Sequence, residues 1–285
     1  MLGTISLSAY ISAYLTRNLT LGAGDLEQNS AGVPTHKYII RDVEGLGLPP
    51  STISKAEFGT SDGSFFLASR VPERNIVITV GFNPNYAIGE TVAKLRRDLY
   101  ALARPGQRVQ MTFAEAYLGP GTSTEWRNIT GYVETHEPVV FAKDPTVKIS
   151  FICTEPFFEG GYDSITGSNT YDFTYAGDVD TGLDLSITMR ATGSSVRLTN
   201  AADGASLGIV GSYVANDVIR FITKPGGKRV YRTGPSGSGD FIGGIIYDST
   251  WPMLKPGRNV LTVSGSISNP ASSGTLGYYK LYGGF

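Results

Sequence analysis

The chain is poor in the residues that most often carry reactive chemistry. Among its 285 residues there is one cysteine, Cys153, and there are two histidines, His36 and His136. A single cysteine excludes an intramolecular disulfide and a multi-cysteine zinc site. Two histidines far apart in the sequence leave little material for a histidine metal site or a Ser-His-Asp triad. We expect Cys153, which ends an apolar segment, to be a small buried side chain rather than a nucleophile.

Charge is also scarce, and it is balanced. Charged residues make up 17% of the chain, and 24 basic residues face 25 acidic ones. A near-neutral surface lacks the basic face that nonspecific nucleic-acid binding needs. No apolar run approaches the roughly 18 residues of a membrane-spanning helix, and no secretory signal is visible at the amino terminus. We expect no nucleic-acid partner, no membrane insertion, no metal and no cofactor.

What the sequence does contain is the pattern of a mainly β protein. Short runs of β-branched and aromatic residues alternate with Gly, Pro, Asn and Asp. In Asn75–Val80 the alternation predicts a strand with one face fully buried and the other partly buried. Asp203-Gly204 is a candidate hairpin turn, and Ser264–Gly274 is expected to be a loop. The expected strands are 37–41, 65–68, 75–80, 109–113, 129–133, 147–153, 195–198, 207–210, 218–222, 259–263 and 278–282.

One segment, Glu90–Ala103, has the pattern of a helix. Val92, Leu95, Leu99 and Leu102 recur at spacings of three and four, which places them on one stripe. Glu90 would lie in the first turn, where a negative charge suits the helix dipole, and Pro105-Gly106 would stop the helix. We expect the helix to pack on one side of a sheet.

A domain boundary is expected near Pro156, where Pro and paired Gly interrupt the strand pattern. Glu predominates up to residue 155 and Asp after it, which favours a second half made almost entirely of strands and Asp-rich turns. We therefore predict two β-sandwich-type domains, 1–155 and 156–285.

Candidate active or binding sites are weak. The glycine-rich segment 237–244 lacks the βαβ context of a phosphate loop, and we expect a surface loop. Asp178, Asp180 and Asp184 could offer oxygens to calcium but lack the spacing of a known loop. Glu125 and Glu134, near Trp126, are the only faint candidates for a glycosidase pair. We expect Trp251 to lie in the core or at a turn that leads into a strand, rather than to hold a sugar.

Several segments, in this order, resemble the distal tail protein family of long-tailed siphophages. In the first half they are 38–45 with 48–50, Ser61-Asp62-Gly63 with 74–78, 94–100 with 105–106, 127–133 and 149–158. In the second half they are 173–178, 196–200, 217–220 and Trp251-Pro252-Met253-Leu254-Lys255-Pro256-Gly257-Arg258-Asn259, which is the sharpest piece. Asn18–Thr35 departs from the family by being longer and richer in Gly and Ala.

The resemblance implies a virion structural protein and no enzyme. Its expected fold is an N-terminal β-sandwich domain with one helix and a β-hairpin, followed by a galectin-like C-terminal jelly roll. Six copies would form a ring at the distal end of a non-contractile tail, between the tail tube protein and a tail-tip, baseplate or fibre protein. We predict that the hairpin around Ser61, Asp62 and Gly63 takes part in ring contacts. Two further classes stay open: a carbohydrate-binding module that recognises host surface glycans, and a glycan hydrolase.

Overall fold

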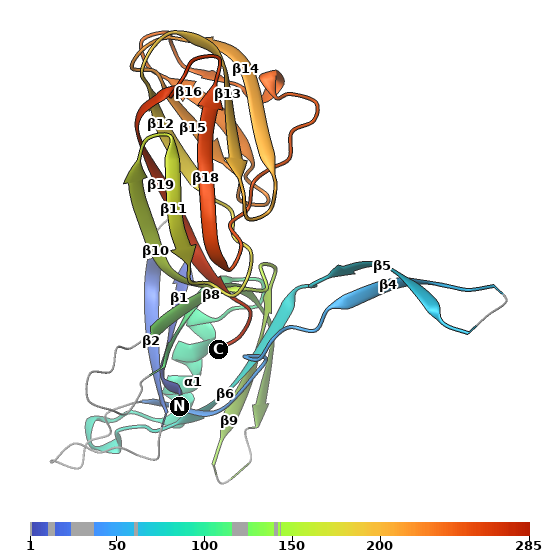
Figure 1. Cartoon of the computed structure of the whole chain (residues 1–285). Coiled ribbons are helices and arrows are strands. Elements are labelled where there is room, and N and C mark those ends of the chain that lie inside the picture. The colour runs from blue at the N-terminus through green and yellow to red at the C-terminus, as the bar shows by residue number, and fades with distance from the viewer. Residues whose placement is uncertain are drawn as a thin grey trace, which may run out of the picture. The chain divides into compact units, whose positions relative to one another are not determined.

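The computed structural model describes residues 2–10, 15–23, 37–59, 62–115, 125–139, 142 and 144–285. The chain divides into two compact units (Figure 1). Unit 1 comprises Met1–Phe158 together with Gly283–Phe285, and unit 2 comprises Glu159–Tyr282. The chain passes from unit 1 to unit 2 after Phe158, three residues beyond the predicted end of the first domain at residue 155. The return of residues 283–285 to unit 1 was not predicted.

Seven strands of unit 1 pair in a closed cycle, in the order β8-β7-β1-β2-β3-β6-β9 and back to β8. All neighbours are antiparallel except β2 and β3, which pair in parallel through Gly22↔Ile39 and Ala23↔Ile40. The cycle therefore leaves neither a first nor a last strand. The strands are β1 Leu2–Tyr10, β2 Leu15–Ala23, β3 Tyr38–Glu44, β6 Arg74–Phe82, β7 Arg108–Glu115, β8 Glu125–Val139 and β9 Thr146–Cys153.

The core of unit 1 follows from the alternation of its strands. Ile76, Ile78 and Val80 of β6 are fully buried, while Val77 and Thr79 between them are partly buried, as predicted. The helix α1, Val92–Leu102, buries Leu95, Leu99 and Leu102 and contacts β6. Thr91 caps it by accepting a hydrogen bond from the backbone of Lys94.

Glu90 is not in the first turn of the helix, as was expected, but precedes the cap. It is buried and ion-paired with Lys37, and it accepts a hydrogen bond from Asn85 N at 3.2 Å. Its carboxylate thereby holds the turn η1, Tyr86–Ile88, which leads from β6 to α1. The periodicity that predicted the helix could not show this, because the partner of Glu90 is 53 residues away.

A separate two-stranded sheet belongs to unit 1. It is a hairpin of β4, Thr52–Glu57, and β5, Ser64–Arg70, and among the described strands it pairs with no other (Figure 1). The pairing runs from Thr52↔Arg70 to Glu57↔Ser64, with a bulge after Ser54.

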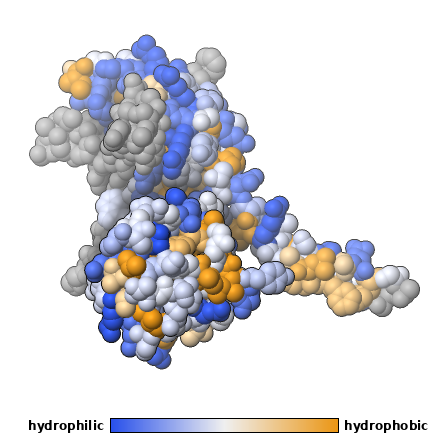
Figure 2. All heavy atoms as spheres, turned by 90° about the horizontal axis from the view of Figure 1, so that it is seen from above, coloured by the Kyte–Doolittle hydropathy of each residue, from blue (hydrophilic) through white to orange (hydrophobic). Residues whose placement is uncertain are grey.

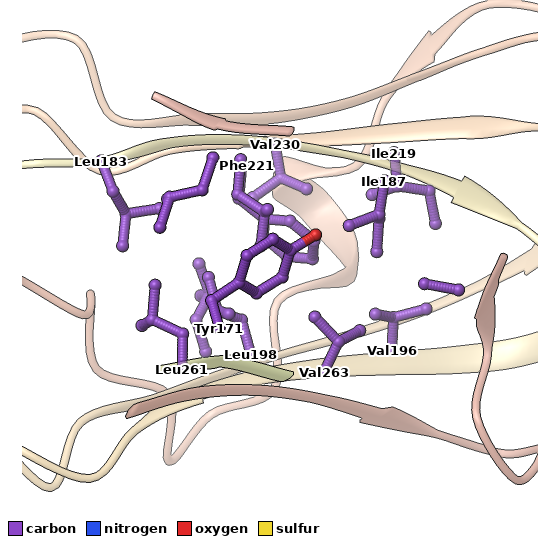
Figure 3. Packing of buried hydrophobic residues seen from close by; sticks show 14 of the residues in the cluster. Tyr171, Leu183, Ile187, Val196, Leu198, Ile219, Phe221, Val230, Leu261 and Val263 are labelled. Carbon is purple, nitrogen blue, oxygen red and sulfur yellow. The ribbon is translucent and has the colours of Figure 1, made fainter. Parts of the chain in front are cut away.

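Unit 2 is a sandwich of two antiparallel sheets, ordered β10-β19-β12-β15-β16-β17 and β11-β18-β13-β14. Its strands are β10 Phe158–Gly167, β11 Thr170–Tyr175, β12 Asp184–Met189, β13 Gly193–Asn200, β14 Ser206–Tyr213, β15 Val218–Ile222, β16 Arg229–Thr233, β17 Gly239–Asp240, β18 Gly257–Gly265 and β19 Ala271–Tyr282, with one short turn η2 at Ile242–Gly244. Inward-facing residues of the two sheets form one core, in which Ile187, Phe221 and Val230 face Tyr171, Leu198 and Leu261 (Figure 3).

The mainly β fold predicted from the sequence is confirmed, and Asp203-Gly204 does connect β13 to β14. The predicted loop Ser264–Gly274 is wrong at both ends. β18 continues to Gly265 and β19 begins at Ala271, where Ser273↔Thr188 and Gly274↔Ile187 are regular pairs. The small residues of this segment lie in strands because backbone pairing, rather than side-chain burial, holds them there.

Candidate interaction surface

The β4–β5 hairpin presents apolar side chains to solvent. Every residue of both strands is exposed, including Ile53, Phe65, Phe66 and Leu67, each of which is at least 60% exposed. Figure 2 shows these apolar residues as orange spheres along the hairpin. Solvent-exposed aromatic and aliphatic groups gathered on one element are typical of a surface that another protein covers.

The turn of this hairpin contains the residues predicted to contact a neighbouring copy. Asp62 and Gly63 immediately precede β5, and Ser61 lies outside the described residues. Gly63 has a φ of +107°, and its carbonyl accepts a hydrogen bond from Phe58 N at 3.4 Å. The Phe58 and Phe65 rings pack with centroids 4.2 Å apart. Contacts among Phe58, Gly63 and Phe65 therefore join the two strands beside the turn, while the strands themselves are exposed.

Strand edges are the natural place for two β proteins to join, because unpaired backbone groups can pair with a neighbour. In unit 1 the main cycle of strands is closed, although β2 and β3 pair through only two residue pairs, whereas each of β4 and β5 has a strand partner on one side only. The hairpin therefore combines strand edges with exposed apolar residues.

The segment Trp251–Asn259 is structural. Trp251 packs against the core of unit 2, as predicted, with the Lys228 ammonium 5.7 Å from its ring. Asn259 is fully buried and holds the turn: its Oδ1 accepts from Lys255 N and from Asn200 Nδ2, both at 3.0 Å. Pro252 is buried, Pro256 is exposed, and Gly257 has a φ of +92°, which suits glycine at the start of β18. These residues shape a turn rather than a binding surface.

The carboxylates considered as calcium ligands have cationic partners. Asp180 is ion-paired with Lys255 at 2.5 Å, and Asp184 makes a two-pronged ion pair with Arg220. This pairing holds the pKa of Arg220 above its ordinary value. Within the residues that the structure describes, there is no cluster of three His, Cys, Asp or Glu side chains able to hold a metal ion.

The other candidate reactive groups are occupied in structural contacts. Glu134 accepts a hydrogen bond from Ser150 Oγ at 2.8 Å, and the Glu125 side chain is outside the described part of the structure. Cys153 is fully buried, which raises the pKa of its thiol to about 12 and confirms its reading as a buried side chain. His136 Nε2 contacts Ala103 O, while His36 lies outside the described residues. The glycine-rich segment is exposed from Thr233 to Asp240, although it includes the two-residue strand β17.

Two features of unit 1 were not predicted from the sequence. The run Phe65-Phe66-Leu67 was read as an ordinary strand, although consecutive large apolar residues without alternation could have signalled exposure to a partner. The buried Arg74 and the segment Gly283–Phe285 that it holds were not singled out. In the described part of the chain, no helix has the length and apolarity to cross a membrane.

No family model matches the chain, and no curated protein sequence does. Solved structures with a comparable arrangement come from phage tails. The Dit protein of phage SPP1, described as a paradigm of the hub adsorption apparatus in phages that infect Gram-positive bacteria, matches with a TM-score of 0.62 and 16% identity, over 86% of this chain and 93% of that chain.

The phage P2 baseplate in its activated conformation also matches. With Ca it gives 9% identity over 98% of both chains, and with Sr it gives 10% identity over 96% of this chain and 97% of that chain. Both TM-scores are 0.42. The likeness to SPP1 Dit shows that the chain has the fold of that hub protein, and it confirms at the level of fold the resemblance noted in the sequence.

Proposed function

We propose that this protein is a structural subunit of a phage tail hub, located in the virion at the distal end of a long non-contractile tail and made in the host cytoplasm. The observation that carries the proposal is the fold shared with SPP1 Dit together with an exposed apolar hairpin on unit 1. A fold alone does not fix a function, and the hairpin supplies the site. The role depends on interfaces and requires no reactive residue.

Copies of the chain would join in a closed ring of six. A ring uses one heterologous contact repeated around an axis, and closure prevents growth into a filament. The β4–β5 hairpin of one copy would pack against unit 1 of the next, burying Phe65, Phe66 and Leu67. The two faces of the ring would then receive the tail tube protein and the tail-tip or baseplate protein.

The test is the mass of the purified protein by light scattering, with and without isolated tail tubes, followed by negative-stain imaging. Six chains of 30.4 kDa give about 180 kDa and a ring with an open centre. A monomer that assembles into such rings only on tail tubes also supports the proposal. A protein that stays at the monomer mass and leaves tail tubes unoccupied contradicts it.

A second function, carbohydrate binding by unit 2, is favoured by one observation. Tyr162 of β10 and Tyr279 of β19 are both exposed, and their ring centroids lie 5.0 Å apart. Tyr162 lies over Gly277, where any side chain would collide with the tyrosine hydroxyl. A fixed pair of exposed rings offers a surface on which a sugar ring can stack, and the hydroxyls offer hydrogen bonds.

A glycan array with the intact protein tests this second role. We expect binding that Tyr162→Ala and Tyr279→Ala both abolish and that Tyr247→Ala preserves, since Tyr247 is fully exposed elsewhere in unit 2. An array without hits, or binding that survives both substitutions, would remove the carbohydrate role from this surface.

A further inference from the structure

The segment Gly283–Phe285 occupies a built site in unit 1. The Phe285 ring packs against Phe113 and Phe158, with ring centroids 5.8 and 6.1 Å away. The Arg127 guanidinium lies 5.2 Å from the centre of the same ring. An aromatic ring enclosed by two others and a cation is held by both apolar contact and cation–π attraction.

The backbone of the segment is bound as well. Phe285 N donates to Leu46 O at 2.9 Å. Gly283 O accepts from Arg74 Nη2, and Gly284 O accepts from Arg127 Nη1. Each of the three consecutive residues therefore makes a backbone hydrogen bond to unit 1, which is a recognition pattern rather than a chance apolar contact.

Arg74 is the centre of the site. Its side chain is 3% exposed and lies 4.7 Å from the centre of the Phe158 ring. Burial lowers the pKa of Arg74. The guanidinium donates to Pro156 O at 2.7 Å and to Gly45 O and Gly47 O at 2.9 Å.

A buried cation is tolerated only when its donors are satisfied. This guanidinium donates to the backbone carbonyls of Pro156, Gly45, Gly47 and Gly283, and the last of these belongs to the segment itself. Removing Gly283 O would leave a buried cationic N–H without that partner.

The site also selects for size at its middle position. A Cβ added to Gly284 would lie 3.3 to 3.4 Å from backbone atoms of Leu46, Gly47 and Leu48. Those neighbours are backbone atoms of a loop that Arg74 holds, so a branched side chain would be excluded. The site thus fits a glycine followed by an aromatic residue.

We propose that unit 1 contains a docking site for a Gly-Gly-Phe segment, and that its occupation by residues Gly283–Phe285 is a latch on unit 2. The chain crosses between the units twice, at residues 158–159 and 282–283. Arg74 binds both the carbonyl of Pro156, just before the first crossing, and that of Gly283, just after the second. With the latch open, only one crossing of unit 2 remains anchored. This proposal stands independently of ring formation.

Hydrogen exchange on the full chain tests the latch. In Phe285→Ala and in Gly284→Val we expect exchange of the amide of residue 285, which donates to Leu46 O, to accelerate about tenfold or more, because local opening breaks this hydrogen bond. Ile88→Ala, an exposed substitution elsewhere in unit 1, serves as the control and should leave this rate unchanged. Equal rates in the wild type and in both site variants would overturn the proposal.

A second experiment asks whether the site is separable from its own segment. In a variant lacking residues 283–285, we expect the peptide acetyl-Tyr-Gly-Gly-Phe-amide to bind in titration calorimetry and acetyl-Tyr-Gly-Gly-Ala-amide to show no binding. Equal binding of the two peptides, or binding of neither, would contradict the site. Should this variant fail to fold, the same two peptides are compared on Phe285→Ala, where the absence of selective binding would count against the site.

Discussion

Tyr171 has a hydroxyl group buried in the core of unit 2 (Figure 3), where it has no hydrogen-bond partner among the residues that the structure describes. Burial raises its pKa to about 12. A buried hydroxyl without a partner costs about 1–3 kcal/mol. We expect Tyr171→Phe to leave the free energy of unfolding unchanged or to raise it by about 1 kcal/mol, measured by urea unfolding.

Tyr175 provides the matched control. It is equally buried, but its hydroxyl donates to Val179 O and accepts from Leu281 N, both at 2.8 Å. Tyr175→Phe leaves both of those groups unpaired, so we expect a loss of about 1–3 kcal/mol. If the two substitutions had equal effects, the contrast between the hydroxyls would be refuted.

Asp217 links the stability of unit 2 to pH. The carboxylate is fully buried, which by itself raises its pKa, but hydrogen bonds from Ser236 and Val214 and the nearby Arg232 bring the pKa below its ordinary value. A lowered folded-state pKa stabilises the fold above the unfolded pKa of about 3.9, and this contribution is lost as pH falls through the folded value. We expect the difference in unfolding free energy between wild type and Asp217→Asn to be constant from pH 7 to 5 and to shrink below about pH 4. A difference that stays the same down to pH 3 would contradict this linkage.

At the level of single elements, substitutions in the β4–β5 hairpin test the proposed ring contact without changing a buried residue. Replacing Asp62-Gly63 by Pro-Pro should break the turn, because proline cannot adopt the φ of +107° found at Gly63. We expect a variant that stays folded, as judged by circular dichroism, but whose ring is weakened or absent in light scattering. An unchanged oligomer mass in the folded variant would exclude the hairpin from the ring contact.

A gentler change separates the turn from the apolar surface. Phe66→Ser removes an aromatic side chain that is 67% exposed and leaves the residues of the turn unchanged. Burial of such a ring at an interface is worth about 1.5–3 kcal/mol, so we expect the concentration for half-assembly to rise roughly tenfold or more. Unit 1 should unfold at the same temperature as in wild type.

The elements that could be predicted from the sequence are those in which apolar residues recur at the spacing of the buried positions. The helix was found because Leu95, Leu99 and Leu102 repeat at helical spacing, and β6 was found because its burial alternates. β4 was missed because both of its faces are exposed, so Thr52–Glu57 carries no alternation to detect. β1 and β2 were missed because small and polar residues interrupt their apolar positions, although Leu7↔Leu19 and neighbouring pairs run regularly.

The features that matter most for the candidate sites depend on contacts across long sequence separations. Closure of the strand cycle needs β8 to pair with β9 as well as with β7, and no local pattern encodes this. The hydrogen bond from Arg74 to Gly283 spans 209 residues. Asp203-Gly204 was predicted correctly as the β13–β14 turn because Asp-Gly is a local signal. The hairpin around residues 61–63 was predicted from the family resemblance, and its proposed contact with a neighbouring copy remains a prediction.

In the whole molecule, the two units have separate cores and should unfold as separate transitions in calorimetry. Leu99 lies in the core of unit 1 and Leu198 in that of unit 2, and both are fully buried. Leu→Ala at such sites costs about 2–5 kcal/mol. We expect Leu99→Ala to lower only one transition temperature and Leu198→Ala only the other. A single transition that both variants shift equally would show that the units unfold together.

The position of Gly283–Phe285 in the chain also has a consequence for synthesis. A ribosome adds about 5–20 residues per second and releases the N-terminal part first. Residues 159–282 are made after the rest of unit 1 and before Phe285. Nascent unit 1 therefore waits with Arg74 short of one carbonyl and Phe158 short of one ring contact until all of unit 2 has been translated. Chains that terminate before residue 283 would carry this defect permanently, so their unit 1 would be less stable than that of full-length chains.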